Sequence, residues 1–205
     1  MMRALVHLRR NLREERGAQI VEFAVSLPLL VVFVVGIFDF SGAFTLKQKL
    51  TNIARDAARV AAADPASDVP SSSTTLPASV ADAYQLIASY FTANQLNNCG
   101  VTAGSGSFAA PATWTFSASG SGCAGSGLII IINRGYYFPE TSGSLPPSVS
   151  CQPPVVVGAQ TAVIGTCVSI QYAYAWRFGN VASLLGSTTV LPSALSATAV
   201  AVNEN

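Results

Sequence analysis

Two features near the N-terminus could support chemistry. One is a peptide bond between a glycine and an alanine, and the other is a carboxylate shortly after it. Gly17 ends a basic segment and Ala18 begins an apolar one. A basic segment ahead of an apolar one is typical of the cytoplasmic face of a membrane, so a hydrolase working at that depth could reach the bond after the small Gly17. Glu22 places a carboxylate in the apolar stretch, where a buried charge is costly unless it is paired. The expected chemistry is therefore cleavage by another protein and charge pairing at Glu22.

Side chains that catalyse reactions or hold metals are scarce in the rest of the sequence. The single histidine, His7, lies ahead of Gly17, and the four cysteines have no C-x-x-C spacing, so no zinc ligand set is expected. The sequence also lacks a G-x-S-x-G motif, a phosphate-binding loop and paired carboxylates in a plausible pocket. We therefore expect no enzyme activity, no cofactor and no metal site.

Glu22 and Asp39 are the charged side chains between residues 18 and 44. A helix over this stretch is about 40 Å long, longer than the hydrocarbon core of a bilayer. Residues 1–17 carry five arginines against two glutamates, which places this end in the cytoplasm by the positive-inside bias. Asp39 is then expected at the periplasmic headgroups, simply hydrated. A contact between Asp39 and a lysine of a neighbouring subunit is the alternative.

Three other interpretations of this region are weaker. A tail that binds nucleic acid should show aromatic or repeated residues, and none is present, so no nucleic-acid partner is expected. An ordinary membrane anchor with an incidental Glu22 is disfavoured because carboxylates inside membranes are uncommon and tend to be functional. A secretory signal peptide cut near residues 61–63 is disfavoured because its apolar core should be only about 7–15 residues long.

The helix predicted from residue 18 continues beyond the membrane to residue 63. Apolar residues recur there at alternating steps of four and three, which predicts one apolar stripe facing a folded domain. Charged residues fall mostly on the other face, and Asp64–Pro65 supplies a natural end. The stripe consists of Leu46, Leu50, Ile53, Ala57 and Val60.

The remaining sequence predicts a small domain after a Pro/Ser/Thr-rich linker over residues 64–79. Ser79 is the expected N-cap of a second amphipathic helix, with Asp82 completing an approximate capping box, and this helix ends near Asn97. Alternating or β-branched runs predict strands, and a Gly-Ala-Gln segment predicts a hairpin turn. The predicted strands cover residues 113–119, 128–138, 155–157, 161–164, 168–178 and 195–202, and the turn covers residues 158–160.

Four cysteines follow the apolar segment, so all of them lie outside the cytoplasm in the predicted topology. An even number there favours disulfides, and four cysteines allow three pairings. We favour Cys99 with Cys123 and Cys151 with Cys167, because each pair closes a short local loop. The second bridge would clamp the predicted hairpin.

The N-terminal sequence resembles the processing site of type IV prepilins, in which a basic leader ends in glycine and a glutamate is the fifth residue after it. The longer stretch over residues 16–62 resembles the TadE family of tight-adherence (Tad, or Flp) pilus minor pilins. The resemblance does not separate TadE from TadF or from minor pilins of other systems. It rests on Glu22-Phe23, Pro28, Gly36, Asp39, Asn52, Ala54-Arg55 and Ala57-Ala58-Arg59.

This resemblance implies a pseudopilin precursor that a prepilin peptidase cuts between Gly17 and Ala18, with Glu22 and Phe23 acting in assembly. The implied partners are other pilin and minor pilin subunits, the inner-membrane assembly platform and the lipid bilayer. The expected function is pilus assembly or initiation and surface attachment. The alternative is a membrane-anchored extracytoplasmic adhesin or binding module that keeps its basic N-terminus.

The implied architecture is α+β and pilin-like: a long transmembrane and amphipathic helix followed by a small disulfide-bonded domain with an antiparallel sheet. Its expected parts are a removable leader (1–17), the helix (18–63), the linker (64–79) and a periplasmic or extracellular domain (80–205). The precursor is expected to cross the inner membrane once, with its N-terminus in the cytoplasm. The mature protein can then enter the extracellular pilus.

Overall fold

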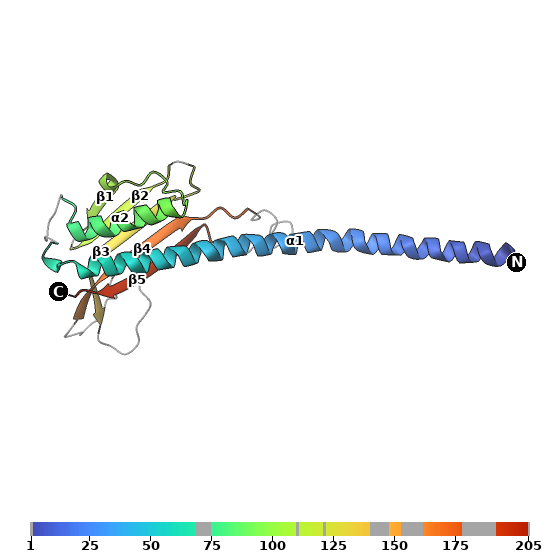
Figure 1. The fold of residues 1–205 in the computed structure, drawn as a ribbon, viewed down its shortest axis with the longest axis horizontal. Coiled ribbons are helices and arrows are strands. Elements are labelled where there is room, and N and C mark those ends of the chain that lie inside the picture. The colour runs from blue at the N-terminus through green and yellow to red at the C-terminus, as the bar shows by residue number, and fades with distance from the viewer. Residues whose placement is uncertain are drawn as a thin grey trace. The chain divides into compact units, whose positions relative to one another are not determined.

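The computed structural model describes residues 2–68, 75–109, 111–120, 122–139, 148–152, 162–177 and 192–204. The chain divides into two compact units, Met1–Gly42 with Trp176–Val190 and Ala43–Ala175 with Leu191–Asn205. The fold is α+β, as the sequence predicts. Its main elements are α1 (Met2–Ala63), α2 (Ala78–Ala93), β1 (Gly106–Ala109), β2 (Thr113–Ala118), β3 (Leu128–Pro139), β4 (Ala162–Ala173) and β5 (Ala194–Val202) (Figure 1).

Helix α1 contains every residue of the predicted helix 18–63, and it begins earlier because the basic segment is helical as well. Pro28 lies inside it. The boundary between the two units falls within α1, after Gly42. The first unit therefore holds the apolar part of the helix, and the second unit holds its amphipathic part.

The second unit contains an antiparallel five-stranded sheet in the order β1-β2-β3-β4-β5. Strands β2, β3 and β5 match predicted strands closely. The short strand β1 was not predicted, because four residues that include a glycine give too weak an alternation. The predicted hairpin turn at residues 158–160 and its first arm lie outside the described residues.

Strand β4 joins the two predicted strands 161–164 and 168–178 without a break, and it also corrects one predicted boundary. The prediction extends it to residue 178, yet it ends at Ala173, and residues 174–177 are not in a strand. The reason is pairing: Ala173 is opposite Ala194, the first residue of β5, and β3 begins at Leu128 opposite Tyr172. Alternation continues in the sequence where no neighbouring strand is left to pair.

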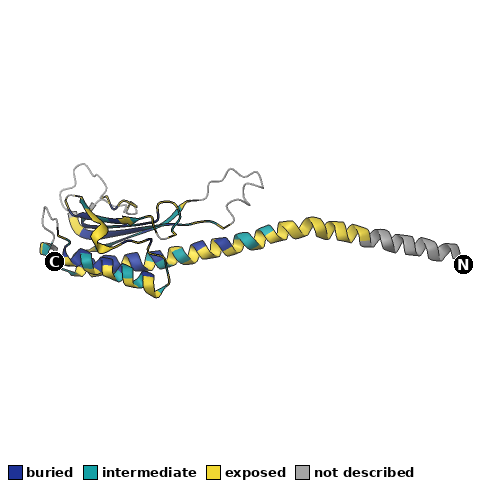
Figure 2. Ribbon diagram, turned by 90° about the horizontal axis from the view of Figure 1, so that it is seen from above, coloured by how far each residue is buried: buried dark blue, intermediate teal, exposed yellow. Residues whose placement is uncertain are grey.

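One face of the sheet packs against α1 and α2, which lie side by side over it (Figures 1 and 2). Alternate residues of the strands point into this core, as expected for a sheet that is covered on that face. Figure 2 shows the buried residues of both helices. The core includes Ile53, Ala57, Val80, Ile87 and Phe91 from the helices and Trp114, Phe116, Ile130, Ile132, Val168, Ile170 and Ala197 from the strands.

The buried stripe of α1 is rotated relative to the prediction. Leu50, Ile53 and Ala57 are buried as predicted, but Val60 is 36% exposed, so its assignment to the stripe is wrong. The buried side chains beyond the predicted set are small: Ala54, Ala58, Ala61 and Ala62. Alanine presents little bulk, so the helix can approach its neighbours closely along this line.

The capping prediction for α2 is also wrong. The N-cap is Pro77, without a side-chain cap, and Ser79 lies inside the first turn. The carboxylate of Asp68, on a short 3-10 helix over Ala66–Asp68, accepts the backbone N–H of Ser79 at 2.8 Å. A side chain from outside the helix therefore satisfies one of the N–H groups that the helix leaves unpaired.

Helix α2 ends at Ala93, before the predicted Asn97. Gln95 adopts a φ of 54°, and the N–H of Leu96 donates to the carbonyl of Phe91 at 2.8 Å. This is the hydrogen-bond pattern that closes many helices and turns the next residue back toward the core. Leu96 accordingly packs against the core.

Candidate functional site

The predicted cleavage and assembly residues lie along one segment of α1 in the first unit. Gly17, Ala18, Glu22 and Phe23 are all exposed. The structure does not bring them together in a pocket. Ala18 and Glu22 are four residues apart, so they lie near one face of the helix, one turn from each other. Among the described side chains, Glu22 has no hydrogen bond or ion pair, so a partner for its carboxylate must come from outside this part of the chain.

The bond after Gly17 lies inside a continuous helix. A peptide bond in a regular helix is poorly presented to a hydrolase, so cleavage there requires the helix to unwind locally. Glycine is about 1 kcal/mol less favourable than alanine in a helix interior, which lowers the energy needed for unwinding at this point. A Cβ built on Gly17 would meet nothing within 4 Å, so packing within the chain does not require glycine here.

Most of the apolar part of α1 is uncovered. One helical stretch of the described chain, Gly17–Ala63, is long and apolar enough to cross a membrane, and none of its most apolar window is buried. Large side chains such as Phe23, Phe33 and Phe38 are at least 64% exposed. Such a surface is stable only in lipid or against other apolar helices. The helix is compatible with a single-pass membrane anchor.

Asp39 departs from the prediction that it is simply hydrated. It is only 6% exposed and has an interaction partner within the chain. The neighbouring Phe40 contacts Trp176, with ring centroids 5.3 Å apart, so the segment that includes Trp176 packs on α1 within the first unit. Asp39 is therefore buried and has a partner inside the chain, whereas Glu22 is exposed.

Comparison with protein-family models connects this helix to a known group. Residues 17–59 match the family described as TadE-like protein. The match covers the candidate cleavage and assembly residues and most of the amphipathic part of α1, and it includes no strand. The similarity to this family is therefore shown for α1 alone. Neither the comparison with curated proteins nor that with solved structures found a significant match.

Just beyond the TadE-like segment, a buried arginine closes the end of α1. Arg134 is 3% exposed and comes from β3, where a β-bulge lies between Asn133 and Tyr136. Its guanidinium donates to the carbonyl of Ala61, to the carbonyl of Asp64 at 2.8 Å and to that of Pro65 at 3.2 Å. These carbonyls lie at the C-terminus of the helix, where backbone acceptors lack helical partners and a positive charge is favourable.

The same guanidinium also contacts residues of β4 and of the segment after β5. It donates to the hydroxyl of Thr166 on β4 at 3.0 Å and to the side-chain oxygen of Asn203, after β5, at 3.3 Å. Burial lowers the pKa of Arg134, and the carboxylates of Asp68 and Asp64 oppose that shift. The sequence analysis missed this residue, although an arginine within an apolar β-branched run was a visible signal.

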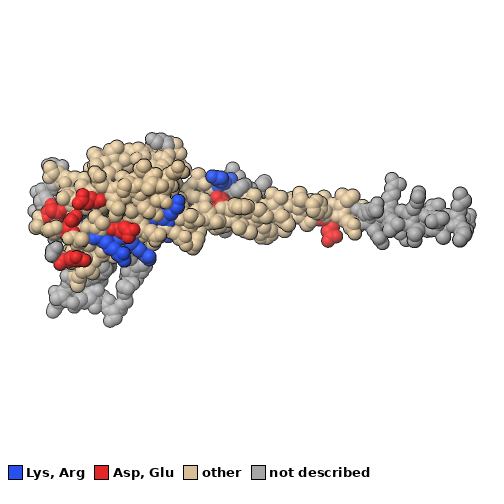
Figure 3. Space-filling model, viewed as in Figure 1, with Lys and Arg blue, Asp and Glu red and all other residues tan. Residues whose placement is uncertain are grey.

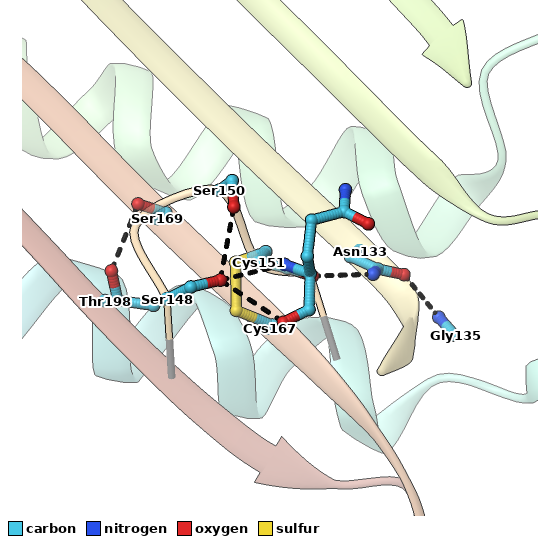
Figure 4. Close-up of a disulfide and its surroundings, with 9 residues drawn as sticks. Asn133, Gly135, Ser148, Ser150, Cys151, Cys167, Ser169 and Thr198 are labelled. Carbon is cyan, nitrogen blue, oxygen red and sulfur yellow. Dashed lines mark hydrogen bonds between the residues drawn. A yellow bond between two sulfur atoms is a disulfide. The ribbon is translucent and has the colours of Figure 1, made fainter. Parts of the chain in front are cut away.

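The second disulfide fixes a segment on the opposite face of the sheet. Cys151 and Cys167 are bonded, and the amide of Asn133 donates to the carbonyl of Cys151 at 2.9 Å (Figure 4). Cys167 lies opposite Asn133 in the register of β3 and β4. The first disulfide joins Cys99 and Cys123, so both bridges have the pairing that loop length favours. In the described ranges, no three His, Cys, Asp or Glu side chains converge where a metal could bind.

Proposed function

We propose that this protein is a minor pilin of a Tad-type pilus, made as a membrane-inserted precursor, cut after Gly17 and used in pilus assembly or initiation and surface attachment. The observation that carries the proposal is the TadE-like match over residues 17–59, which coincides with a helix whose most apolar window has no buried residue. That half is suited first to a bilayer and then to a bundle of similar helices.

The basic segment supports a cytoplasmic N-terminus for the precursor. The four bonded cysteines support an oxidising, extracytoplasmic location for the second unit. A prepilin peptidase would act on the bond after Gly17 at the membrane surface. Other pilin subunits and the assembly platform of the inner membrane would then receive the mature helix.

The decisive test replaces Gly17 with leucine. The Gly17→Leu variant should remain an uncut precursor in the inner membrane, because leucine stabilises the helix where it must unwind and adds bulk at the cut bond. Gly36→Leu is the matched control, since Gly36 is also a helical glycine and a Cβ added there would meet nothing within 4 Å. The mass and the N-terminal sequence of the membrane-derived protein report the cut.

Cleavage of the wild-type chain and the Gly36→Leu variant to an Ala18 start, with none in Gly17→Leu, supports the proposal. Normal processing of Gly17→Leu would contradict it. A wild-type protein that retains its basic N-terminus would instead favour the membrane-tethered adhesin or binding module.

A further inference from the structure

In the second unit, the exposed basic side chains of the described chain all lie on α1. Lys47, Arg55 and Arg59 are exposed and Lys49 is half-buried, whereas the unit's other basic residue, Arg134, is buried. These four helical residues are called the basic face. They surround one acidic residue, Asp56, so the face has a net positive charge.

The described part of the chain does not neutralise the exposed arginines of the basic face. Neither Arg55 nor Arg59 has an ion pair among the described residues. Lys47, Arg55 and Arg59 are separated by multiples of four residues, so they follow one row over roughly 18 Å of helix. The core uses the side of α1 opposite Arg55 and Arg59, through Ile53, Ala54 and Ala57 among others, so packing does not explain these two charges. Lys47 and Lys49 flank the core-facing side of the helix.

Acidic side chains gather instead at the end of the second unit where α1 stops. Asp82 is exposed on α2, just after its first turn, and Glu204 is exposed where its backbone N–H donates to the carbonyl of Ala62 at 3.2 Å. Asp64 and Asp68 lie beside them around Arg134. Figure 3 shows most of the acidic side chains of this unit near one end, with basic side chains beside them and further along the helix. The set Asp64, Asp68, Asp82 and Glu204 is called the acidic end.

We propose that the basic face of one copy of this protein docks on the acidic end of a second copy. The two surfaces have opposite charge and are displaced from each other along α1. A contact between different surfaces of two identical chains is heterologous, and it repeats head to tail rather than closing into a dimer. The inference rests on the proposed pilin function only for its setting, because such a repeat would run along the axis of a fibre.

Charge complementarity of this kind mainly selects the partner and sets its register. Exposed ion pairs each contribute little and are screened by salt, so the contact by itself is weak. Within a fibre, the apolar part of α1 would supply most of the association, and the charged contact would set how far each copy is shifted.

The test uses two charge-reversed forms of the full-length protein in a neutral detergent. In the first form Arg55→Glu and Arg59→Glu reverse the basic face, and in the second Asp82→Lys and Glu204→Lys reverse the acidic end. Each form alone should self-associate about tenfold more weakly than wild type at low salt, as expected from the loss of two or three weak pairs. An equal mixture of the two forms should recover association, because the reversed surfaces are again complementary.

Sedimentation velocity at low and high ionic strength measures the association, and Arg177→Glu, an exposed arginine of the first unit, is the matched control. The proposal is overturned if either reversed form self-associates as strongly as wild type. It is also overturned if the mixture does not recover association. Loss of binding to vesicles that contain anionic lipid, with self-association unchanged, overturns it in favour of a lipid surface. The assay needs no cleavage after Gly17, so its failure is distinguishable from failure of the proposed function.

Discussion

At the scale of single residues, Arg134 shows how one side chain joins parts of the second unit that are distant in sequence. Its partners are Ala61, Asp64 and Pro65 at the end of α1, Thr166 on β4 and Asn203 after β5. Much of the α1 interface consists of alanines, which bury little apolar area per residue. The polar contacts of Arg134 therefore contribute to holding the last turn of α1 in place.

Replacing Arg134 with methionine should destabilise the second unit by about 3 kcal/mol, because the helix carbonyls and Asp68 lose a buried partner. Denaturant unfolding followed by near-UV circular dichroism measures the change. Arg177→Met removes an exposed arginine and should change the unfolding free energy by no more than about 0.5 kcal/mol. Equal midpoints for the two variants would show that Arg134 does not stabilise the fold.

At the scale of elements, the disulfide between Cys151 and Cys167 ties the segment 148–152 to a central strand of the sheet. β4 pairs with β3 on one side and β5 on the other through backbone hydrogen bonds, which do not need the sulfur atoms. The bridge is therefore expected to constrain the unfolded chain without determining the sheet.

The double variant Cys151→Ala/Cys167→Ala should keep the far-UV dichroism of the sheet and lose roughly 3 kcal/mol of stability, as the chain-entropy model gives for a loop of this length. Cys99→Ala/Cys123→Ala provides the comparison, because its sequence separation of 24 against 16 changes the loss of stability in the same model by only about 0.4 kcal/mol. Thermal unfolding with the remaining bridge intact gives both values. Loss of the sheet signal in the first variant would mean that the bridge is needed for pairing of β4.

At the scale of the whole molecule, Glu22 links the membrane-inserted precursor to an assembled fibre. Cleavage after Gly17 would create an ammonium group on Ala18, one helical turn from the Glu22 carboxylate. When the helix moves from the bilayer edge into an apolar bundle, each charge alone costs several kcal/mol to bury, and a close pair offsets much of that cost. Between staggered subunits, the pair would also set the axial register.

Glu22→Gln should therefore be inserted and cut yet fail to co-purify with other pilus subunits, because it keeps the shape and loses the charge. Ser26→Ala is the control: Ser26 lies one turn further along the same face, and its hydroxyl donates to the Phe23 carbonyl at 3.2 Å within the helix. Immunoblots of sheared pili and of membranes separate assembly from processing. Assembly of Glu22→Gln at the wild-type level would leave charge pairing without a role.

The sequence by itself determined the features that depend on neighbouring residues. The long helix, the position of Glu22 within it and strands such as β2, β3 and β5 follow from hydropathy and alternation over a few turns or a few residues. Loop length sufficed to favour the observed disulfide pairing. Each of these signals is local, so it can be read without knowing what the segment packs against.

Only the tertiary structure decided the features that depend on distant residues. The contact between Asp68 and Ser79 spans 11 positions, and that between Arg134 and Ala61 spans 73. The rotation of α1 exposes Val60 and buries Ala61, and it depends on how closely the helix approaches its neighbours. The end of β4 depends on where its partner strands begin. Periodicity predicts that a helix has an apolar face, but the exact rotation of that face and the partner of a buried charge are set by the surfaces that meet it.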